Sequence, residues 1–347
     1  MRLSDLRVPH SLAAALAATV LATGVSLIAP ADSHATDGDK ALSCVIQGET
    51  PVKADTAVFD RGSKGTAIAK LTGTEVPLTI RHFPNPLKGR VEISTSEGKG
   101  SVRVDGWAEK DSFRYFAAKD LPIVGANIWI TKGQELHLVG ASAKGFTTEL
   151  KILGSRNPAK KVSIPCSGVT IEMPDMPADD MPERARTYQM RTDSIDLYDG
   201  PRGALVYTLE MEEGTRKVFW STESRGGYVH VMSRADITID AWAKQKDLAW
   251  TRHAELVDLA AVAPKPFRER KLAMKDPPAV VVADQELPIH DKPQNRPTPI
   301  GYVEVGARFF PMEKSGEWTN VMPESLAVLP PDGGGFWVRT AGIPGSK

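Results

Sequence analysis

The sequence predicts an all-β protein built as a tandem series of small, mostly antiparallel β-barrels joined by short linkers. Three observations support this fold class. The chain of 347 residues contains 29 Gly and 26 Pro, which indicates many turns and few long helices. Segments that alternate apolar and polar residues end in tight Asp-Gly or Asp-Ala turns, which is the pattern of a β-hairpin. These hairpins belong to a longer phrase that recurs along the chain.

The recurring phrase ends in a strand that carries a tryptophan. Residues 102–109 read Val-Arg-Val-Asp-Gly-Trp-Ala-Glu, and residues 237–244 read Ile-Thr-Ile-Asp-Ala-Trp-Ala-Lys. Near the C-terminus, residues 334–339 read Gly-Gly-Phe-Trp-Val-Arg. Upstream of the second and third copies lie the strands Gly-Gly-Tyr-Val-His-Val at 226–231 and Gly-Glu-Trp-Thr-Asn-Val at 316–321. The same order of turns and strands therefore predicts copies of one small module.

This order resembles the bacterial SH3 (SH3b) module, which has an Asp-Gly-Pro-like turn, a glycine hairpin, a Gly-Trp strand and a closing Gly-Trp-Val strand. Asp199-Gly200-Pro201 supplies the opening turn best. The resemblance covers residues 55–112, 115–172, 190–250 and 283–343, and it implies tandem SH3-like barrels. The copy at 115–172 departs from the pattern, because Phe146 replaces a tryptophan and no Gly-Trp pair closes it. A generic antiparallel sandwich with similar turns is the alternative.

Two linkers are expected between these modules. Residues 173–189 combine Pro, Met and Asp, which predicts an extended spacer. Residues 251–282 contain Ala-Glu-Leu-Val-Asp-Leu-Ala-Ala-Val, which is compatible with a short helix, followed by basic sequence interrupted by prolines. Both segments favour a modular organisation.

The N-terminus has the form of a signal peptide. Arg2 and Arg7 precede an apolar run, and Ser33 and Ala35 provide the small residues that signal peptidase requires. We therefore expect residues 1–35 to be a signal peptide and the mature protein to be exported, either periplasmic or secreted. An uncleaved membrane anchor is the alternative, because roughly 20 apolar residues suffice to cross a bilayer. No second apolar stretch is that long, so no membrane span is expected after cleavage.

The chain contains two cysteines, Cys44 and Cys166. In an oxidising compartment they could form one disulfide that closes a long loop, and two buried free thiols are the alternative. Their separation excludes a catalytic Cys-x-x-Cys pair.

The composition and motifs indicate neither catalysis nor nucleic-acid binding. Lys and Arg total 43, as do Asp and Glu, so no excess positive charge attracts nucleic acid. The seven histidines are dispersed, and no motif for a metal or a nucleotide cofactor occurs. We therefore predict no catalytic residues, no metal and no cofactor. An unrecognised hydrolase remains an alternative, since the carboxylates of glycosidases carry no local signature.

Aromatic residues are the candidate ligand contacts, because they offer a large apolar area at low entropic cost. Two pairs, Phe219-Trp220 and Phe309-Phe310, lie on predicted strands. One ring of each pair should point away from its own module unless a bulge intervenes. We slightly favour packing of that ring against the next module over ligand binding. Further candidates for a groove are Tyr198, Tyr228 and Trp318.

A tryptophan also stands at the start of each predicted last strand. These residues, Trp107, Trp242 and Trp337, are interpreted as core or signature residues of the modules in preference to ligand contacts.

The sequence thus favours an exported, non-catalytic binding protein whose SH3-like modules recognise peptidoglycan, a peptide or a protein in the cell envelope. SH3b modules normally accompany a catalytic domain, and because none is recognised in this chain, a stand-alone adaptor is favoured. The alternative is a structural or assembly protein whose stacked modules mainly contact one another and a partner.

Overall fold

The computed structural model describes residues 42–72, 75–84, 87, 89–95, 101–175, 181–251, 277–294 and 298–345. The chain divides into two compact units, Met1–Gly38 and Asp39–Lys347, and every described residue lies in the second. The predicted signal peptide, residues 176–180 of the first linker and the predicted short helix of the second lie outside the described residues.

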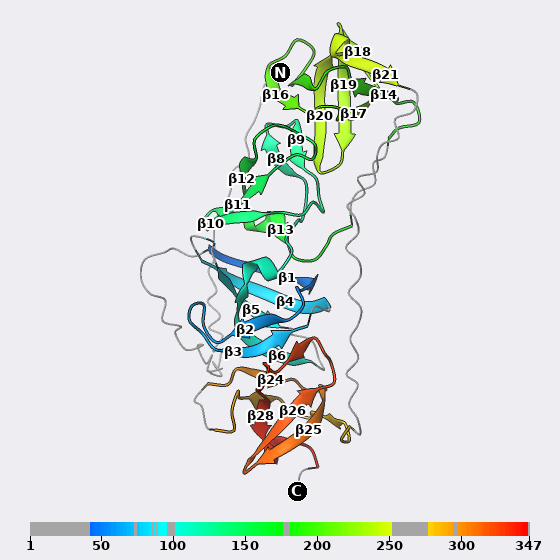
Figure 1. Ribbon diagram of the computed structural model, residues 1–347. Coiled ribbons are helices and arrows are strands. Elements are labelled where there is room, and N and C mark those ends of the chain that lie inside the picture. Colours follow the sequence, from blue (N-terminus) through cyan, green and yellow to red (C-terminus); the bar gives the residue numbers. More distant parts are fainter. Residues whose placement is uncertain are drawn as a thin grey trace, which may run out of the picture. The chain divides into compact units, whose positions relative to one another are not determined.

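The predicted all-β fold is confirmed. Every regular element in the described residues is a β-strand or a three-residue turn of 3-10 helix, and the paired strands are antiparallel (Figure 1). No helix in this part of the chain has the length and apolar character needed to cross a membrane.

Repeat 1 is a set of six strands followed by a 3-10 turn. The elements are β1 (Leu42–Pro51), β2 (Thr56–Phe59), β3 (Ala67–Leu71), β4 (Glu75–Phe83), β5 (Arg90–Thr95), β6 (Val102–Glu109) and η1 (Lys110–Ser112). They pair in the order β1-β4-β5-β6-β2-β3.

Repeat 3 has the same connectivity. Its elements are β14 (Arg186–Met190), β15 (Ser194–Tyr198), β16 (Leu205–Glu210), β17 (Val218–Ser221), β18 (Ser224–Arg225), β19 (Tyr228–Arg234), β20 (Ile237–Lys244), η3 (Gln245–Asp247) and β21 (Leu248–Thr251). The strand order is β14-β17-β19-β20-β15-β16, with β21 added beside β14 and β18 beside β19.

Repeat 4 follows this order with one short connection. Its elements are β22 (Val281–Val282), β23 (Leu287–Ile289), β24 (Gly301–Val303), β25 (Arg308–Ser315), β26 (Trp318–Pro323), β27 (Val328–Leu329), β28 (Phe336–Arg339) and η4 (Thr340–Gly342). Strands pair as β22-β25-β26-β28 and β23-β24, and a single bridge between Trp337 and His290 joins the two sets.

Repeat 2 is the least regular copy. Its elements are β7 (Phe116–Ala117), β8 (Leu121–Val124), β9 (Ile128–Ile130), β10 (Leu138–Ser142), β11 (Gly145–Leu150), β12 (Lys160–Ile164), η2 (Cys166–Gly168) and β13 (Val169–Thr170). Strands pair as β10-β11-β12, β8-β9 and β7-β13. As in the other repeats, a 3-10 turn follows the last long strand.

The last long strand of each repeat is built by alternation. In β6, Val102, Val104, Gly106 and Ala108 are buried and the residues that alternate with them are partly or fully exposed. The strand continues through Asp105-Gly106, so the tight turn predicted there is wrong. Gly106 is also on the inner side, where an added Cβ would lie 2.6 Å from the Cγ1 of Val58. Only glycine therefore lets β2 approach β6 this closely.

None of the sheets formed by the described residues closes into a barrel. Strand edges are instead covered by another repeat, which satisfies backbone groups that closure would otherwise satisfy. The third strand of repeat 4, β24, pairs with β6 of repeat 1, and the third strand of repeat 2, β9, pairs with β20 of repeat 3 (Figure 1).

The same two pairs of repeats make a second contact. The connection before the last strand of repeat 4 contains β27, which pairs with β3 of repeat 1. The corresponding connection of repeat 2 bridges Ser155 to Met211, directly after β16 of repeat 3. We call this two-point contact the clasp. It occurs twice, from repeat 4 to repeat 1 and from repeat 2 to repeat 3.

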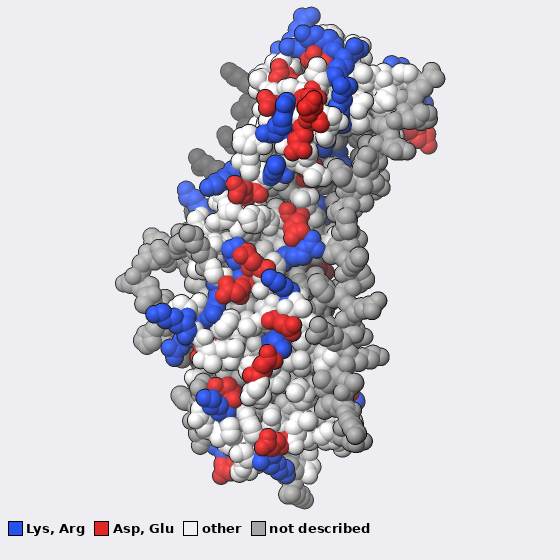
Figure 2. Space-filling model, in the orientation of Figure 1, with Lys and Arg blue, Asp and Glu red and all other residues white. Residues whose placement is uncertain are grey.

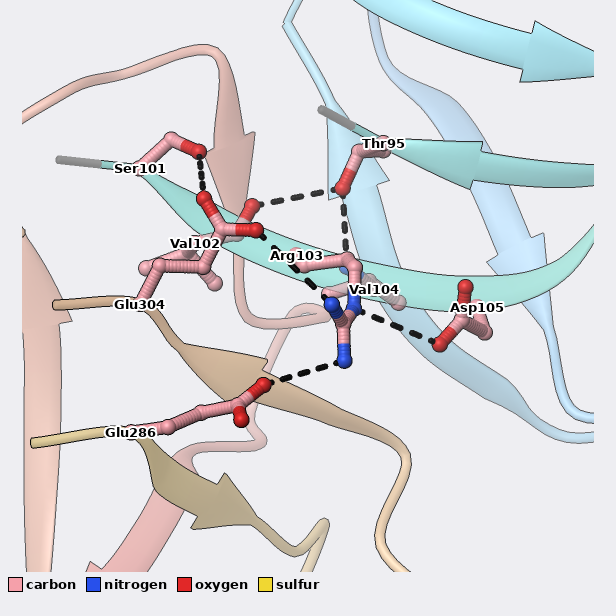
Figure 3. Close-up of polar contacts among 8 residues, drawn as sticks. All are labelled: Thr95, Ser101, Val102, Arg103, Val104, Asp105, Glu286 and Glu304. Carbon is pink, nitrogen blue, oxygen red and sulfur yellow. Dashed lines mark hydrogen bonds and ion pairs between the residues drawn. The ribbon is translucent and has the colours of Figure 1, made fainter. Parts of the chain in front are cut away.

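Charged side chains reinforce the clasp between repeats 4 and 1. The guanidinium of Arg103 on β6 lies 3.1 Å from Glu286 and 3.9 Å from Glu304, and it also lies 3.8 Å from Asp105 (Figure 3). Ser101 Oγ donates to Glu304 at 2.8 Å. Because these groups are partly exposed, their pairing contributes more to register than to stability.

Repeats 1 and 2 are joined by a covalent and an apolar contact. Cys44 on β1 forms a disulfide with Cys166 in η2, with their Cα atoms 5.9 Å apart. Phe83 and Phe146 meet edge to face with ring centroids 4.7 Å apart. Buried side chains of all four repeats belong to one continuous hydrophobic cluster.

Candidate functional site

A tryptophan lies at the same place on the outward face of three repeats. Trp107, Trp242 and Trp337 each stand three positions before a 3-10 turn and are half-buried. Their strand neighbours on both sides are buried, so alternation directs each indole away from the core. The interpretation of these tryptophans as core residues is therefore wrong, and their interpretation as signature residues of the modules stays a prediction. Repeat 2 has Ser163 at this place and no aromatic ring.

In repeat 3 the indole is flanked by two other aromatic rings. Trp242 on β20 pairs with Tyr198 on β15 and with His230 on β19. The imidazole of His230 stacks on Trp242 with centroids 5.0 Å apart and 21° between the planes. His230 Nε2 also lies 2.5 Å from Asp240 Oδ1, which fixes the imidazole against the indole.

A tyrosine pair continues this surface towards the 3-10 turn. The rings of Tyr198 and Tyr228 are perpendicular, with centroids 5.6 Å apart and an 87° angle between their planes. Lys244, opposite Tyr228 on β20, places its Nζ 5.2 Å from the centre of the Tyr198 ring. The Lys244 amine is protonated at neutral pH like an ordinary lysine, and the hydrogen bond to Tyr198 raises its pKa further. We call Tyr198, Tyr228, His230, Trp242 and Lys244 the aromatic face of repeat 3.

An open hollow adjoins the aromatic face. It is lined by Arg191, Gly227, Tyr228, Lys244, Gln245 and Lys246. The chain positions Arg191 through two contacts: its Nε donates to the carbonyl of Leu248 at 2.8 Å, and its backbone N–H donates to the carbonyl of Asp247 at 2.9 Å. Three cationic residues, Arg191, Lys244 and Lys246, thus line the same hollow as Tyr228.

The equivalent face of repeat 1 is covered by its own side chains. Arg90 occupies the place of Tyr228, and its guanidinium carbon lies 3.2 Å from the centre of the Phe59 ring. Arg90 also pairs with Glu109 at 3.2 Å, and Glu109 stands where repeat 3 has Lys244. An added Cβ on Gly62 would lie 3.1 Å from the Trp107 ring, so the loop before β3 covers this indole.

The equivalent face of repeat 4 is compact. His290 and Trp318 meet edge to face at 5.0 Å, and their exposed fractions are 8% and 7%. Arg339 lies over the Trp318 ring, 4.4 Å from its centre, and pairs with Glu317. The cation of this face is therefore already neutralised by a carboxylate.

An aspartate fixes the position of the ring at the end of the second strand. In repeat 3, Asp199 follows Tyr198, and its Oδ1 accepts from the Ala204 backbone N–H at 2.7 Å. In repeat 1, Asp60 follows Phe59 and accepts from the Thr66 N–H at 2.8 Å. These bonds close the loop after the strand and hold its last residue in place.

The aromatic residues singled out by sequence occupy different environments. Three of them, Tyr198, Tyr228 and Trp318, lie on equivalent outward faces. Phe219 and Phe309 are fully buried in the hydrophobic cluster. Trp220 is half-buried and Phe310 is 9% exposed.

Sequence reasoning missed three members of the aromatic face, namely His230, Trp242 and Lys244. A signal for this face is present in the sequence, since Phe59-Asp60, Tyr198-Asp199 and His290-Asp291 repeat an aromatic-Asp dipeptide at the end of the second strand. A tryptophan three positions before the 3-10 turn accompanies each dipeptide.

The face offers binding chemistry. Within the described residues, no three His, Cys, Asp or Glu side chains lie together as a metal site would require. The aromatic face combines apolar rings with the protonated amine of Lys244, a combination whose chemistry suits apolar groups and negative charge. Comparison with protein-family models, with curated proteins and with solved structures finds no match.

Proposed function

We propose that this chain is an exported, non-catalytic binding protein made of SH3-like modules, and that the aromatic face of repeat 3 binds its ligand. The shared strand order of repeats 1, 3 and 4 supports the SH3-like assignment, as does the 3-10 turn after the last long strand of all four repeats. The signal-like segment at residues 1–35 supports export.

One observation carries the choice of repeat 3. Repeats 1 and 4 cover the corresponding rings with arginine and neutralise that arginine with glutamate. In repeat 3, Tyr228 replaces the arginine or tryptophan, and no described carboxylate lies within ion-pair distance of Lys244. Tyrosine and tryptophan are common anchors of binding surfaces because they combine a rigid apolar ring with a polar group. The proposed ligands are peptidoglycan or an envelope peptide or protein.

The test is retention of the purified protein on insoluble peptidoglycan and on immobilised envelope protein extract. The paired substitution Tyr198→Ala with Tyr228→Ala should lower retention at least about tenfold, because it removes two ring contacts worth roughly 1 kcal/mol each. Trp250→Ala is the matched control, since this tryptophan is 56% exposed in the same repeat but lies on β21, away from the face.

The control should be retained like the unsubstituted protein. Equal retention of the double variant and the unsubstituted protein would exclude the aromatic face as the binding surface. Thermal melts of both variants separate loss of binding from loss of folding.

A second candidate function is structural, with repeats that mainly contact one another and an assembly partner. The clasp favours it, because the same two-point contact between repeats is made twice with strand edges that a partner could otherwise use. Failure of the unsubstituted protein to bind either material would favour this candidate over ligand recognition.

A further inference from the structure

We infer that the ligand of repeat 3 is an acidic peptide, held by Lys244, Lys246 and Arg191 beside the Tyr198–Tyr228 pair. This inference rests on the proposed function and specifies the chemistry of the same surface. These three cationic residues all line the hollow next to Tyr228.

Comparison of repeats 1 and 3 shows that the two lysines are absent from the rim of repeat 1, whereas the place of Arg191 is taken there by Lys53, whose backbone N–H also donates to the last residue of the 3-10 turn. The two positions flanking the start of the 3-10 turn are Lys244 and Lys246 in repeat 3, and they are Glu109 and Asp111 in repeat 1. The same fold therefore carries opposite charge at the same rim. Of these two rims, only that of repeat 3 would attract an anion, and it would repel a cationic ligand of a face like that of repeat 1.

The charge acts locally. Over the visible side of the molecule, acidic and basic side chains are interspersed, and formal net charge is zero (Figure 2). General attraction of polyanions is thus weak, and affinity must come from groups placed at the hollow. Asp196, beside the tyrosine pair, accepts hydrogen bonds from the Tyr198 hydroxyl at 3.4 Å and from Thr208 Oγ1 at 2.7 Å, so its carboxylate is bonded within repeat 3.

Ring geometry favours a peptide over a glycan. Sugars bind across exposed, flat aromatic faces, whereas His230 covers one face of Trp242 and the Lys244 amine lies over Tyr198. The Tyr198 and Tyr228 rings meet edge to face, so they do not form one flat platform. Rings that are not coplanar suit a single apolar side chain or a proline ring, with a neighbouring carboxylate directed to the lysines.

The experiment compares two end-capped hexapeptides, one alternating Glu and Pro and the other alternating Gln and Pro, by fluorescence anisotropy with the full chain. The Glu peptide should bind about tenfold more tightly at low salt, and the difference should shrink at high salt because the cations are exposed. In the double variant Lys244→Gln with Lys246→Gln, the affinity for the Glu peptide should fall to the affinity for the Gln peptide. Lys160→Gln with Lys161→Gln, an equal loss of charge on β12, is the matched control and should change nothing.

Three results would overturn the inference. Equal affinity for the two peptides would remove the charge requirement and leave an aromatic-dependent binding protein, as proposed above. If the protein binds the anionic glycan heparin through Lys244 and Lys246 and does not bind the Glu peptide, that result would assign the hollow to a polysaccharide. No binding of either peptide would reject the acidic peptide, and retention on peptidoglycan or envelope protein would then decide the proposed function separately.

Discussion

Tyr115 is a phenol held in an apolar site where the chain passes from repeat 1 to repeat 2. Its ring packs near Phe83, and its hydroxyl donates to the carbonyl of Lys110 at 3.3 Å. Burial strongly raises the pKa of Tyr115, and the charge of Asp111 adds to the effect. The folded protein therefore keeps this phenol neutral at a pH where the unfolded chain ionises.

This shift makes stability fall at alkaline pH. The folded pKa of Tyr115 lies above the unfolded value near 10, so its contribution is intact below about pH 10 and is lost as pH rises further, by up to about 1.4 kcal/mol per unit. Tyr115→Phe should cost about 1 kcal/mol at pH 7, through the lost hydrogen bond. Above pH 10 the variant should lose stability less steeply than the unsubstituted protein. Urea unfolding between pH 7 and 12 measures the free energy of unfolding of both proteins. A difference in this free energy that is the same at every pH would contradict the proposed role of Tyr115.

The aromatic face shows how a few substitutions at fixed positions change the chemistry of one scaffold. The place of Tyr228 is taken by Arg90 in repeat 1 and by Trp318 in repeat 4. Alternation alone places all three outward, but only their cross-strand partners decide whether the face is covered or open. This is why Tyr198 and Tyr228 could be singled out from sequence while Lys244 was not.

The repeats are joined because a strand of one repeat pairs with the edge of another repeat's sheet. In the clasp between repeats 4 and 1, Gly301 pairs with Val104, and an added Cβ on Gly301 would lie 2.1 Å from the Arg103 carbonyl oxygen. A backbone oxygen cannot move aside as the end of a flexible side chain can. Glycine at position 301 of β24 therefore permits β6 to approach this closely.

Gly301→Ala should therefore destabilise the protein by about 2 kcal/mol and loosen the clasp. Gly140→Ala is the matched control, because an added Cβ on this strand glycine would lie 3.5 Å from Thr147 and cause no overlap. Urea unfolding measures the stability of each variant, and amide hydrogen exchange of β6 reports whether β24 has separated. If both variants unfold at the same urea concentration, close approach of β24 is not required.

At the scale of the whole molecule, the disulfide between Cys44 and Cys166 spans a sequence separation of 122 residues and joins repeats 1 and 2. A cross-link that closes a loop of this length restricts the unfolded chain strongly. The disulfide supplements the mixed contacts of the clasps, which include partly exposed charges.

Mass spectrometry of protein isolated from an oxidising compartment should find Cys44 joined to Cys166. Cys44→Ser with Cys166→Ser should lower the free energy of unfolding by about 4 kcal/mol. A reducing agent should lower the stability of the unsubstituted protein by a similar amount and leave the double variant unchanged. Free thiols on both residues in the isolated protein would contradict the proposed covalent link.

Much of the strand content followed from local patterns. The phrases at 102–109 and 237–244 form β6 and β20, but each is one continuous strand, so the turns predicted at Asp105-Gly106 and Asp240-Ala241 are wrong. The expected strand at Tyr228 is β19. The Phe219-Trp220 pair has one buried and one half-buried ring, as alternation predicts. Phe309 and Phe310 are both buried. This burial depends on packing against residues far away in the sequence, so no local sequence pattern predicts it.

The sequence by itself determined that this chain is nearly all β and that its last strands carry tryptophans, because backbone propensity and period-two alternation are local properties. Only the tertiary structure decided that strands of one repeat complete the sheets of another, that the tryptophans face outward, and that Tyr198, Tyr228 and Lys244 lie together in repeat 3. Those outcomes depend on partners far apart in the chain, such as Lys70 and Asp332, which lie 2.8 Å apart across 262 positions. No local pattern specifies which edges and charges will meet at that separation.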